Sequence, residues 1–366
     1  MLVEFHLIQN HAPSNLNRDD TGSPKEAVFG GYKRARISSQ CLKRSIRRSE
    51  IFQSALEGQV ATRSRQIATR LRPVLEALEC DEAVIELIAK KATALGSGKE
   101  SDKGETRQTM FLGDEEVSRL GRQLVALYDA DRAAFASLKN EDVEKALKDA
   151  SLPRSVDIAL FGRMTTSAAF EDVSAAMQVA HALSTSKVER QFDYYTAVDD
   201  LPSPEDGMGA DMIGDVEFNS ATYYKYFSLD WTQLLKNLGG DEEAARKTLA
   251  AFIQAMALTT PTGKQNSFAA HNPPDGILVE VKEQRVPVSY ANAFVEPARP
   301  NGEGDLVAVS IGKLAQYAGQ LKRSYGLAGQ SFWLSTRDVP VVGALSVESL
   351  AGLSEAVLQA IPSGRP

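Results

Sequence analysis

The sequence has few of the residues that build covalent cross-links, metal centres or membrane spans. Its 366 residues include two cysteines, Cys41 and Cys80, which make no disulfide framework and argue against a zinc site. No stretch approaches the roughly 18 consecutive apolar residues of a membrane span. The N-terminal segment MLVEFHLIQNH lacks the basic leader of a signal peptide. We therefore expect a cytoplasmic protein with no membrane partner and no bound metal.

Motifs for nucleotide binding and nucleophilic catalysis are incomplete. GSGKES (96–101) lacks the first glycine of a phosphate loop and has Glu100 where Ser or Thr would bind magnesium. GQSFW (329–333) has Trp333 where a nucleophile elbow needs glycine. The histidines have no paired metal-ligand spacing, and we expect structural roles for all four: His6, His11, His181 and His271. Nothing here supplies the nucleophile or cofactor loop of a metabolic enzyme, so we expect no cofactor.

Positive charge is scarce overall but concentrated at one place. The chain has 41 Lys and Arg against 48 Asp and Glu, a formal net charge of −7. Seven of the basic residues lie between Tyr32 and Arg48, in FGGYKRARISSQCLKRSIRR (29–48), with no acidic residue among them. Charge sorted in this way usually meets an anionic partner.

The second half of this cationic block has the pattern of a helix. Ser38 and Ser39 are good N-cap residues, and Leu42 and Ile46 fall four residues apart on one face. A helix start adds amide donors for an anion, and Lys and Arg form charge-assisted bonds to phosphate. The alternative is a solvated surface face. The missing carboxylates and the polar loop that precedes the helix (11–34) favour a groove for a phosphate backbone, held without reading its sequence.

Elsewhere, strand and helix patterns interleave irregularly. Val3, Phe5 and Leu7 alternate with polar residues and predict a half-buried strand. Residues from about 63 to 149 repeat apolar positions at helical spacing and predict a helical insertion. Strands are expected at 155–164, 221–230, 266–271, 276–281 and 286–294, and helices at 171–184, 231–261 (two segments, separated at Gly239-Gly240) and 314–325. This order favours an α+β fold with large insertions.

Two pairs of adjacent acidic residues leave a second function open. Asp19-Asp20 and Asp199-Asp200 would suit a divalent-metal nuclease if they converged on one ion. Adjacent aspartates in loops more often cap turns through backbone amides. Both interpretations stand at the level of the residues.

Longer motifs resemble a known family. NRDD (17–20), FGG-x-(K/R)-R-x-R-ISSQ-x-LKR (29–44), VDIALFGRM-x-TS (156–167), TAVDDL (196–201), KQ-x-x-FAA-x-NP (264–273) and ANAF (291–294) occur in one fixed order. Together they resemble the CasC-type backbone subunit of the type I-E CRISPR Cascade complex. The helical block and the C-terminal tail match only in position and character.

The resemblance implies a hand-like subunit. Its palm would be a modified RNA-recognition-motif (ferredoxin-like) antiparallel sheet from residues 1–50, 155–193 and 218–366. A helical insertion at 51–154 would form the fingers, and a long β-like loop at 194–217 the thumb. The aromatic signature of a free-standing RNA-recognition motif is absent, so the RNA would be held by charge rather than by bases stacked on the sheet.

The resemblance also implies a set of RNA-binding residues. The guide-facing positions would be Arg18, Lys25, Lys33, Arg34, Arg36, Ser38, Ser39, Gln40, Lys43, Arg44, Arg47, Arg163, Met164, Tyr194 and Tyr195. Met164 would wedge against bases, and the tyrosines would offer stacking surfaces. The thumb tip has no aromatic residue, so Met208, Met212 or Ile213 would press on the RNA there.

The implied role is that of a scaffold without a catalytic residue. Copies would assemble head to tail along the crRNA, contact other Cascade subunits, and present the guide to a target DNA strand in antiviral defense. The rival function is a metal-dependent, RNA-cleaving backbone subunit like those of type III CRISPR complexes, with Asp19 or Asp20 as a metal ligand.

Overall fold

The computed structural model of the chain describes residues 1–96, 99, 101, 103–147, 155–197, 212–300, 305–362 and 364. The chain divides into two compact units that alternate along the sequence. The first contains residues 1–52, 178–230 and 250–364, and the second contains chiefly 53–177 and 231–249. The functional division into palm, fingers and thumb stays a prediction.

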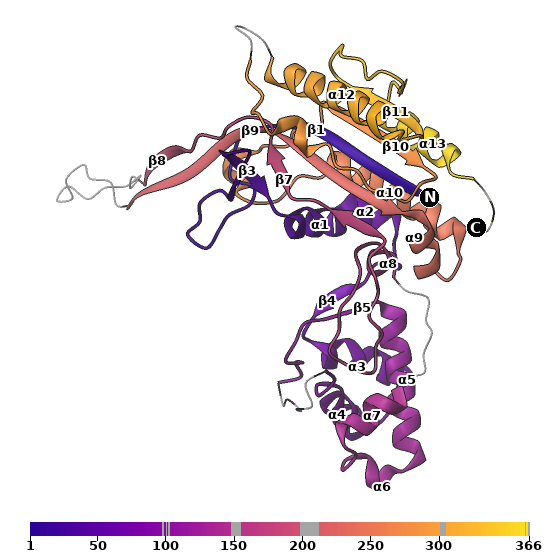
Figure 1. The fold of residues 1–366 in the computed structure, drawn as a ribbon. Helices are drawn as coiled ribbons and strands as arrows, with labels where there is room; N and C mark the ends of the chain where they lie inside the picture. Colours follow the sequence, from indigo (N-terminus) through magenta and orange to yellow (C-terminus); the bar gives the residue numbers. More distant parts are fainter. Residues whose placement is uncertain are drawn as a thin grey trace, which may run out of the picture. The chain divides into compact units, whose positions relative to one another are not determined.

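The first unit is built on one large sheet (Figure 1). In the described part of the chain, ten strands join in the order β12-β11-β10-β1-β9-β7-β3-β2, with β6 and β8 also paired to β9. Along this order, neighbouring strands are antiparallel except β11 and β12, and β8 is antiparallel to β9. The strands are β1 (Leu2–Ser14), β2 (Glu26–Phe29), β3 (Tyr32–Ile37), β6 (Met177–Val179), β7 (Ala182–Ser184), β8 (Gln191–Ala197), β9 (Met212–Asp230), β10 (Gly276–Lys282), β11 (Gln330–Ser335) and β12 (Leu345–Ser346).

Both faces of the central strand β1 are buried. Register pairs His6 with Tyr226 and Leu7 with Lys225, so these two pairs lie on opposite faces of the sheet. On the His6 face, Ile8 and Tyr224 pack against helix α12 (Leu306–Tyr325). On the other face, Phe5 packs edge-on against Phe252. The predicted half-buried strand is therefore wrong in one respect, because helices and loops cover both faces.

Helix α1 (Ser39–Arg48) forms as its pattern predicts. Ser38 is the N-cap, and its Oγ accepts a hydrogen bond of 3.3 Å from the Cys41 amide. Leu42 and Ile46 are buried. The other helical segments assigned wholly or partly to this unit are α2 (Glu50–Ala55), α10 (Glu242–Leu258), α11 (Gln265–Phe268), η1 (Ala291–Phe294), α12 and α13 (Leu350–Ala360).

The second unit is mostly helical and has its own core. Leu71, Leu75, Ile88 and Leu124 are among the side chains buried in it. A two-stranded sheet accompanies the helices. The elements that lie wholly in the second unit are β4 (Thr62–Ser64), α3 (Ile67–Ala77), α4 (Glu82–Ala92), β5 (Met110–Leu112), α5 (Asp114–Ala130), α6 (Arg132–Phe135), α7 (Asn140–Leu147), α8 (Val156–Phe161) and α9 (Trp231–Asn237).

Several predicted elements are of the wrong type. The strand expected at 155–164 is helix α8 over Val156–Phe161, where the apolar run 158–161 lacks the alternation that distinguishes a strand. The helix expected at 171–184 is replaced by β6 and β7, which pair with β9. The strands expected at 266–271 and 286–294 contain instead the short helix α11 and the turn η1. The strands at 221–230 and 276–281 and the helices α9, α10 and α12 are confirmed.

Candidate nucleic-acid interface

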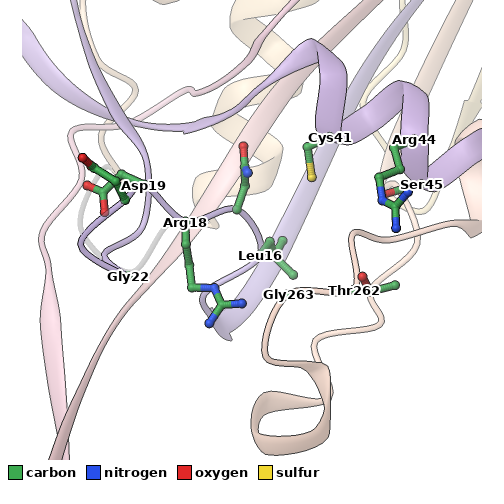
Figure 2. Close-up of a pocket in the computed structure, with 11 residues that line it drawn as sticks. Leu16, Arg18, Asp19, Gly22, Cys41, Arg44, Ser45, Thr262 and Gly263 are labelled. Carbon is green, nitrogen blue, oxygen red and sulfur yellow. The ribbon is translucent and has the colours of Figure 1, made fainter. Parts of the chain in front are cut away.

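A hollow of about 540 Å³ opens beside the start of helix α1 (Figure 2). Its wall combines α1, the loop that follows β1, and a second loop near Thr262. The lining residues are Leu16, Asn17, Arg18, Asp19, Asp20, Gly22, Cys41, Arg44, Ser45, Thr262 and Gly263. All belong to the first unit. The hollow thus lies at the cationic block, where the sequence predicts a phosphate groove.

The loop after β1 is held by its own side chains. Asp19 Oδ1 accepts hydrogen bonds from the amides of Thr21 and Ser23, each 3.0 Å, and from Thr21 Oγ1 at 2.7 Å. The Thr21 hydroxyl is the main cause of a lowered pKa at Asp19. The Ser38 amide donates to Asn17 Oδ1 at 2.9 Å, which fastens the loop to the start of α1. One carboxylate of the first acidic pair is therefore engaged in a turn.

The second loop packs tightly on the first. A Cβ atom added at Gly263 would lie 2.5 Å from the carbonyl oxygen of Leu16 and 2.6 Å from that of Asn15. The next residue, Lys264, has φ of 51°, a left-handed conformation that is costly for a lysine. Gln265 braces the loop: its amide donates to the Pro261 carbonyl at 3.0 Å. Glycine at 263 is required by this close approach.

Two arginines provide the positive charge of the hollow. In Figure 2, Arg18 and Arg44 extend toward the loop of Thr262 and Gly263, while Asp19 lies on the other side of its own loop. Both arginines are exposed, and neither forms an ion pair with any residue that the structure describes. Arginines without a carboxylate partner on a concave surface are suited to bind phosphate.

Other predicted residues flank the hollow on α1. Ser38 is buried as the N-cap, Ser39 is half-buried, and Gln40 is exposed. Lys43 is half-buried, and burial lowers the pKa of its ammonium. Arg47 is half-buried one turn further along.

The β2–β3 hairpin and the residue just before it provide three of the remaining basic residues. Lys33 is exposed, and Lys25, just before β2, is half-buried. The Arg36 guanidinium donates to the Glu26 carbonyl at 3.0 Å and to His181 Nδ1 at 3.1 Å. His181, expected in a helix, lies between β6 and β7, where burial and then the charge of Arg36 lower its pKa.

Arg34 is placed differently from its neighbours, because it is fully buried. Its guanidinium donates to four carbonyls, those of Ser184 (3.0 Å), Thr185 (2.9 Å), Phe294 (2.7 Å) and Val295 (3.1 Å). The structure therefore does not bring this arginine together with the exposed cations. Its donors are used inside the fold.

The second unit contains two of the predicted residues, one buried and the other exposed. Arg163 is buried, and it donates to Glu116 Oε1 at 2.7 Å and to the Phe111 carbonyl at 3.1 Å. Met164, the next residue, is 94% exposed. The first residue stabilises its own unit, and the second is available to a partner.

The hairpin of β8 and β9 presents aromatic side chains. Tyr194 is 65% exposed, and Phe192, on the same face of β8, is nearly as exposed. Tyr195 faces the other way, over Gly214. Sequence reasoning missed Phe192, although its alternation with Tyr194 could have identified it. Met208 lies outside the described residues, and for Met212 and Ile213 only the backbone, paired with β8, is described.

One cluster of possible metal ligands occurs in the described part of the chain: Glu4, His6 and Glu280. It is buried in the sheet, away from the residues of the hollow, and its carboxylates are paired with Lys282 and Lys322. Two ammonium groups oppose a divalent cation there. Asp199 and Asp200 lie outside the described residues, as do Ser97, Gly98 and Glu100 of the GSGKES segment.

The hollow also contains residues that the sequence did not identify. Asn17, Cys41, Thr262 and Gly263 line it. The sequence signal for the last two is their position directly before the KQ-x-x-FAA-x-NP motif (264–273). Among the described residues, no helix is long and apolar enough to cross a membrane.

Comparisons with known proteins identify chains that are similar in sequence and fold. No curated protein matches the chain. A solved chain described as "CRISPR RNA-guided surveillance complex, pre-nicking" is similar, with 28% identity and a TM-score of 0.84, covering 98% of this chain and 100% of the other. A second, described as "CRISPR RNA-guided surveillance complex", has 24% identity and a TM-score of 0.75, covering 99% and 100%, and supports the fold.

The family comparison covers nearly the whole sequence. The model of the family described as CT1975-like protein matches residues 3–359. Together with the structural matches, this confirms the resemblance to a Cascade backbone-type subunit and the predicted α+β fold. The chain belongs to the CT1975-like protein family.

Proposed function

We propose that this protein is a guide-RNA-binding scaffold of a CRISPR surveillance complex, and that the hollow beside α1 holds the phosphate backbone. The observation that carries the proposal is the pair Arg18 and Arg44, which line the hollow without a carboxylate partner among the described residues. The similarity to chains of RNA-guided surveillance complexes supports the same conclusion.

Each part of the site contributes a distinct interaction. Arg18 and Arg44 would form charge-assisted bonds to phosphate oxygens from two walls of the hollow. Lys43 and Arg47 would extend the contact along α1, and Lys33 along the hairpin. Met164 and the aromatic side chains of β8 would contact bases by packing and stacking. Because the charged contacts reach only the backbone, any guide sequence would be accepted, and base pairing would read the target.

The assembly is the finer part of the proposal. Copies of the subunit would line up head to tail along the crRNA in a type I-E-like complex in the cytoplasm. They would meet other Cascade subunits and expose the guide for pairing with target DNA. A heterologous interface of this kind does not close on itself, so the bound RNA would set its length.

We propose that the subunit itself has no catalytic role. Asp19 is engaged by three hydrogen bonds within its turn, and the one described ligand cluster is paired with lysines. The RNA-cleaving alternative therefore gains no support from the described residues. It remains an outcome of the tests below.

Charge reversal in the hollow tests RNA binding. Arg44→Glu should weaken binding of a labelled single-stranded RNA, and Arg18→Glu/Arg44→Glu should weaken it by at least about 100-fold, since a hydrogen bond to a charged group contributes about 1.5–3 kcal/mol. The control is Arg323→Glu, which reverses an exposed charge at the end of α12. Equal loss in the control, or none in the hollow variants, would contradict the phosphate assignment.

A cleavage assay tests the alternative. The assembled protein and guide are incubated with complementary RNA and magnesium, with Asp20→Ala as the matched variant. The scaffold proposal expects intact RNA in both reactions. Regularly spaced cuts that disappear in Asp20→Ala would establish the nuclease instead.

A further inference from the structure

Lys225 is a fully buried lysine whose counter-charge is not found in the described part of the chain. It lies on β9 opposite Leu7, with 1% of its surface exposed. Its ammonium donates a hydrogen bond of 2.5 Å to Gln9 Oε1, and no described carboxylate forms an ion pair with it. Lysine is almost never buried in this way without a partner, because an ammonium loses strong hydration.

The groups around this ammonium are neutral. Gln9 is held in place by its own amide, which donates to the Asn272 carbonyl at 2.5 Å. Burial, followed by the charge of Lys225, lowers the pKa of His11 to about 3, so the imidazole is uncharged near neutral pH. Burial raises the pKa of the Cys41 thiol and of the Tyr223 hydroxyl, so neither supplies an anion.

Lys225 is linked to the hollow through Cys41. The ammonium and this thiol interact electrostatically, and Cys41 is part of the hollow's wall. A positive charge thus lies behind the wall, on the same face of the sheet as Gln9. Arg18 and Arg44 add two more positive charges at the surface of the hollow, whose acidic lining residues are Asp19, engaged in its own turn, and Asp20.

We propose that a backbone phosphate of the guide RNA is the missing counter-charge of Lys225, which acts from behind the wall as a positioning residue for that phosphate. The inference rests on the proposed function of the hollow. Its chemistry is electrostatic attraction in a region of low dielectric, where a buried charge acts more strongly than an exposed one.

The burial of Lys225 gives this interaction a pH signature. Burial lowers the pKa of its ammonium to about 8 in the free protein. An adjacent phosphate favours the charged form and raises that pKa, so binding takes up a proton. RNA affinity should therefore fall as the pH rises above about 8. His11 and Tyr223 do not change charge in this range, and Cys41 titrates only at a higher pH.

The test compares Lys225→Met and Lys225→Gln with the wild type, using a labelled oligoadenylate whose bases do not titrate near pH 8. Both variants should bind about tenfold more weakly near pH 7, because one positive charge that attracts the phosphate is lost. Their dependence of log K on log salt should be shallower by about 0.7. The fall in affinity between about pH 7 and about pH 9 should disappear. Phe227→Leu, a buried change on the same strand and face, is the control, and should keep the wild-type pH profile.

The outcomes separate this inference from the function on which it rests. If both Lys225 variants bind with wild-type affinity and pH profile while Arg44→Glu is weakened, the inference is wrong and the hollow remains the RNA site. If Arg44→Glu also binds normally, the proposed function fails. If a Lys225 variant does not fold, the pH dependence of RNA affinity in the wild type tests the inference. A wild-type affinity that does not change between about pH 7 and about pH 9 overturns it.

Discussion

The two faces of the central sheet differ in whether their buried charges have an oppositely charged partner among the described residues. On the face covered by α12, Glu4 is paired with Lys282, and Glu280 with Lys322 and His6. On the other face, the Lys225 ammonium donates a hydrogen bond to a glutamine and has no carboxylate partner among the described residues. On the first face, the opposite charges all come from the chain itself. On the second face, we propose that the opposite charge comes from a bound ligand. The comparison indicates which face is structural and which is functional.

The balanced face extends beyond its ion pairs. Glu4 Oε1 also accepts hydrogen bonds from the Tyr226 hydroxyl and from the Val288 amide, the latter 2.7 Å long. Tyr290 stacks on His6, with ring centroids 4.3 Å apart, and donates to Glu280 at 2.7 Å. Burial opposes the ionisation of Glu280, but His6 and Lys322 outweigh it and lower its pKa. Its contribution to stability is therefore present above the ordinary glutamate pKa and is lost in strong acid.

Breaking the balanced face should have the largest effect on stability. Glu4→Gln keeps the shape of the side chain but leaves the Lys282 ammonium buried without a carboxylate. We expect a loss of about 3–5 kcal/mol in the free energy of unfolding, measured by urea denaturation. RNA affinity of the folded fraction should be unchanged. A mild effect on stability would show that the network is not held by charge.

The matching change on the other face should act in the opposite direction. Lys225→Met removes an unpaired buried ammonium and keeps a side chain of similar length. Its free energy of unfolding should stay the same or rise by about 1–4 kcal/mol, although RNA binding weakens. A destabilised variant would place Lys225 with the structural residues and remove the contrast between the faces.

The pH dependence of stability should distinguish the faces further. The folded-state pKa of Lys225 is about 8, below the ordinary lysine pKa of 10.5, so the unfolded chain binds more protons between these values. The free energy of unfolding of the wild type, compared with that of Lys225→Met, should therefore increase as pH rises from about 8 to about 10. The increase is up to about 1.4 kcal/mol per pH unit. Urea denaturation of both proteins at the same series of pH values measures this difference in free energy of unfolding. A difference that does not change with pH would contradict the prediction.

The smallest expected effect concerns the two cysteines. RNA in the hollow should slow alkylation of Cys41, which lines the wall, and leave Cys80 in the helical unit as an internal reference. Mass spectrometry after a brief maleimide pulse measures both rates in one sample. Equal slowing at both positions would point to a general loss of access.

Local patterns predicted the elements whose signals are local. The N-cap Ser38 and the buried pair Leu42 and Ile46 lie within nine residues of one another, and α1 forms as expected. The hollow itself could be predicted only in part. Thr262 and Gly263 belong to it because Gly263 packs against the backbone of Leu16, a contact between segments far apart in the sequence.

Side-chain direction could not be derived from residue type. Arg34 and Lys33 are adjacent in the basic run, yet one is buried and the other exposed, since alternate residues of a strand point to opposite faces. Likewise, Arg163 pairs with Glu116 and Met164 points outward. The carbonyls and carboxylates that receive these arginines come from distant segments.

The buried Arg34 has a mechanical consequence. It fastens the hairpin to the ends of β7 and η1 through four carbonyls, and Gly30 at the hairpin turn lies so close to the Val295 carbonyl that an added Cβ would be 2.0 Å from its oxygen. The hairpin therefore cannot swing independently of these segments. A force on an RNA bound to Lys33 would therefore be transmitted directly to the sheet. The hairpin would act as a rigid attachment and not as a flexible one.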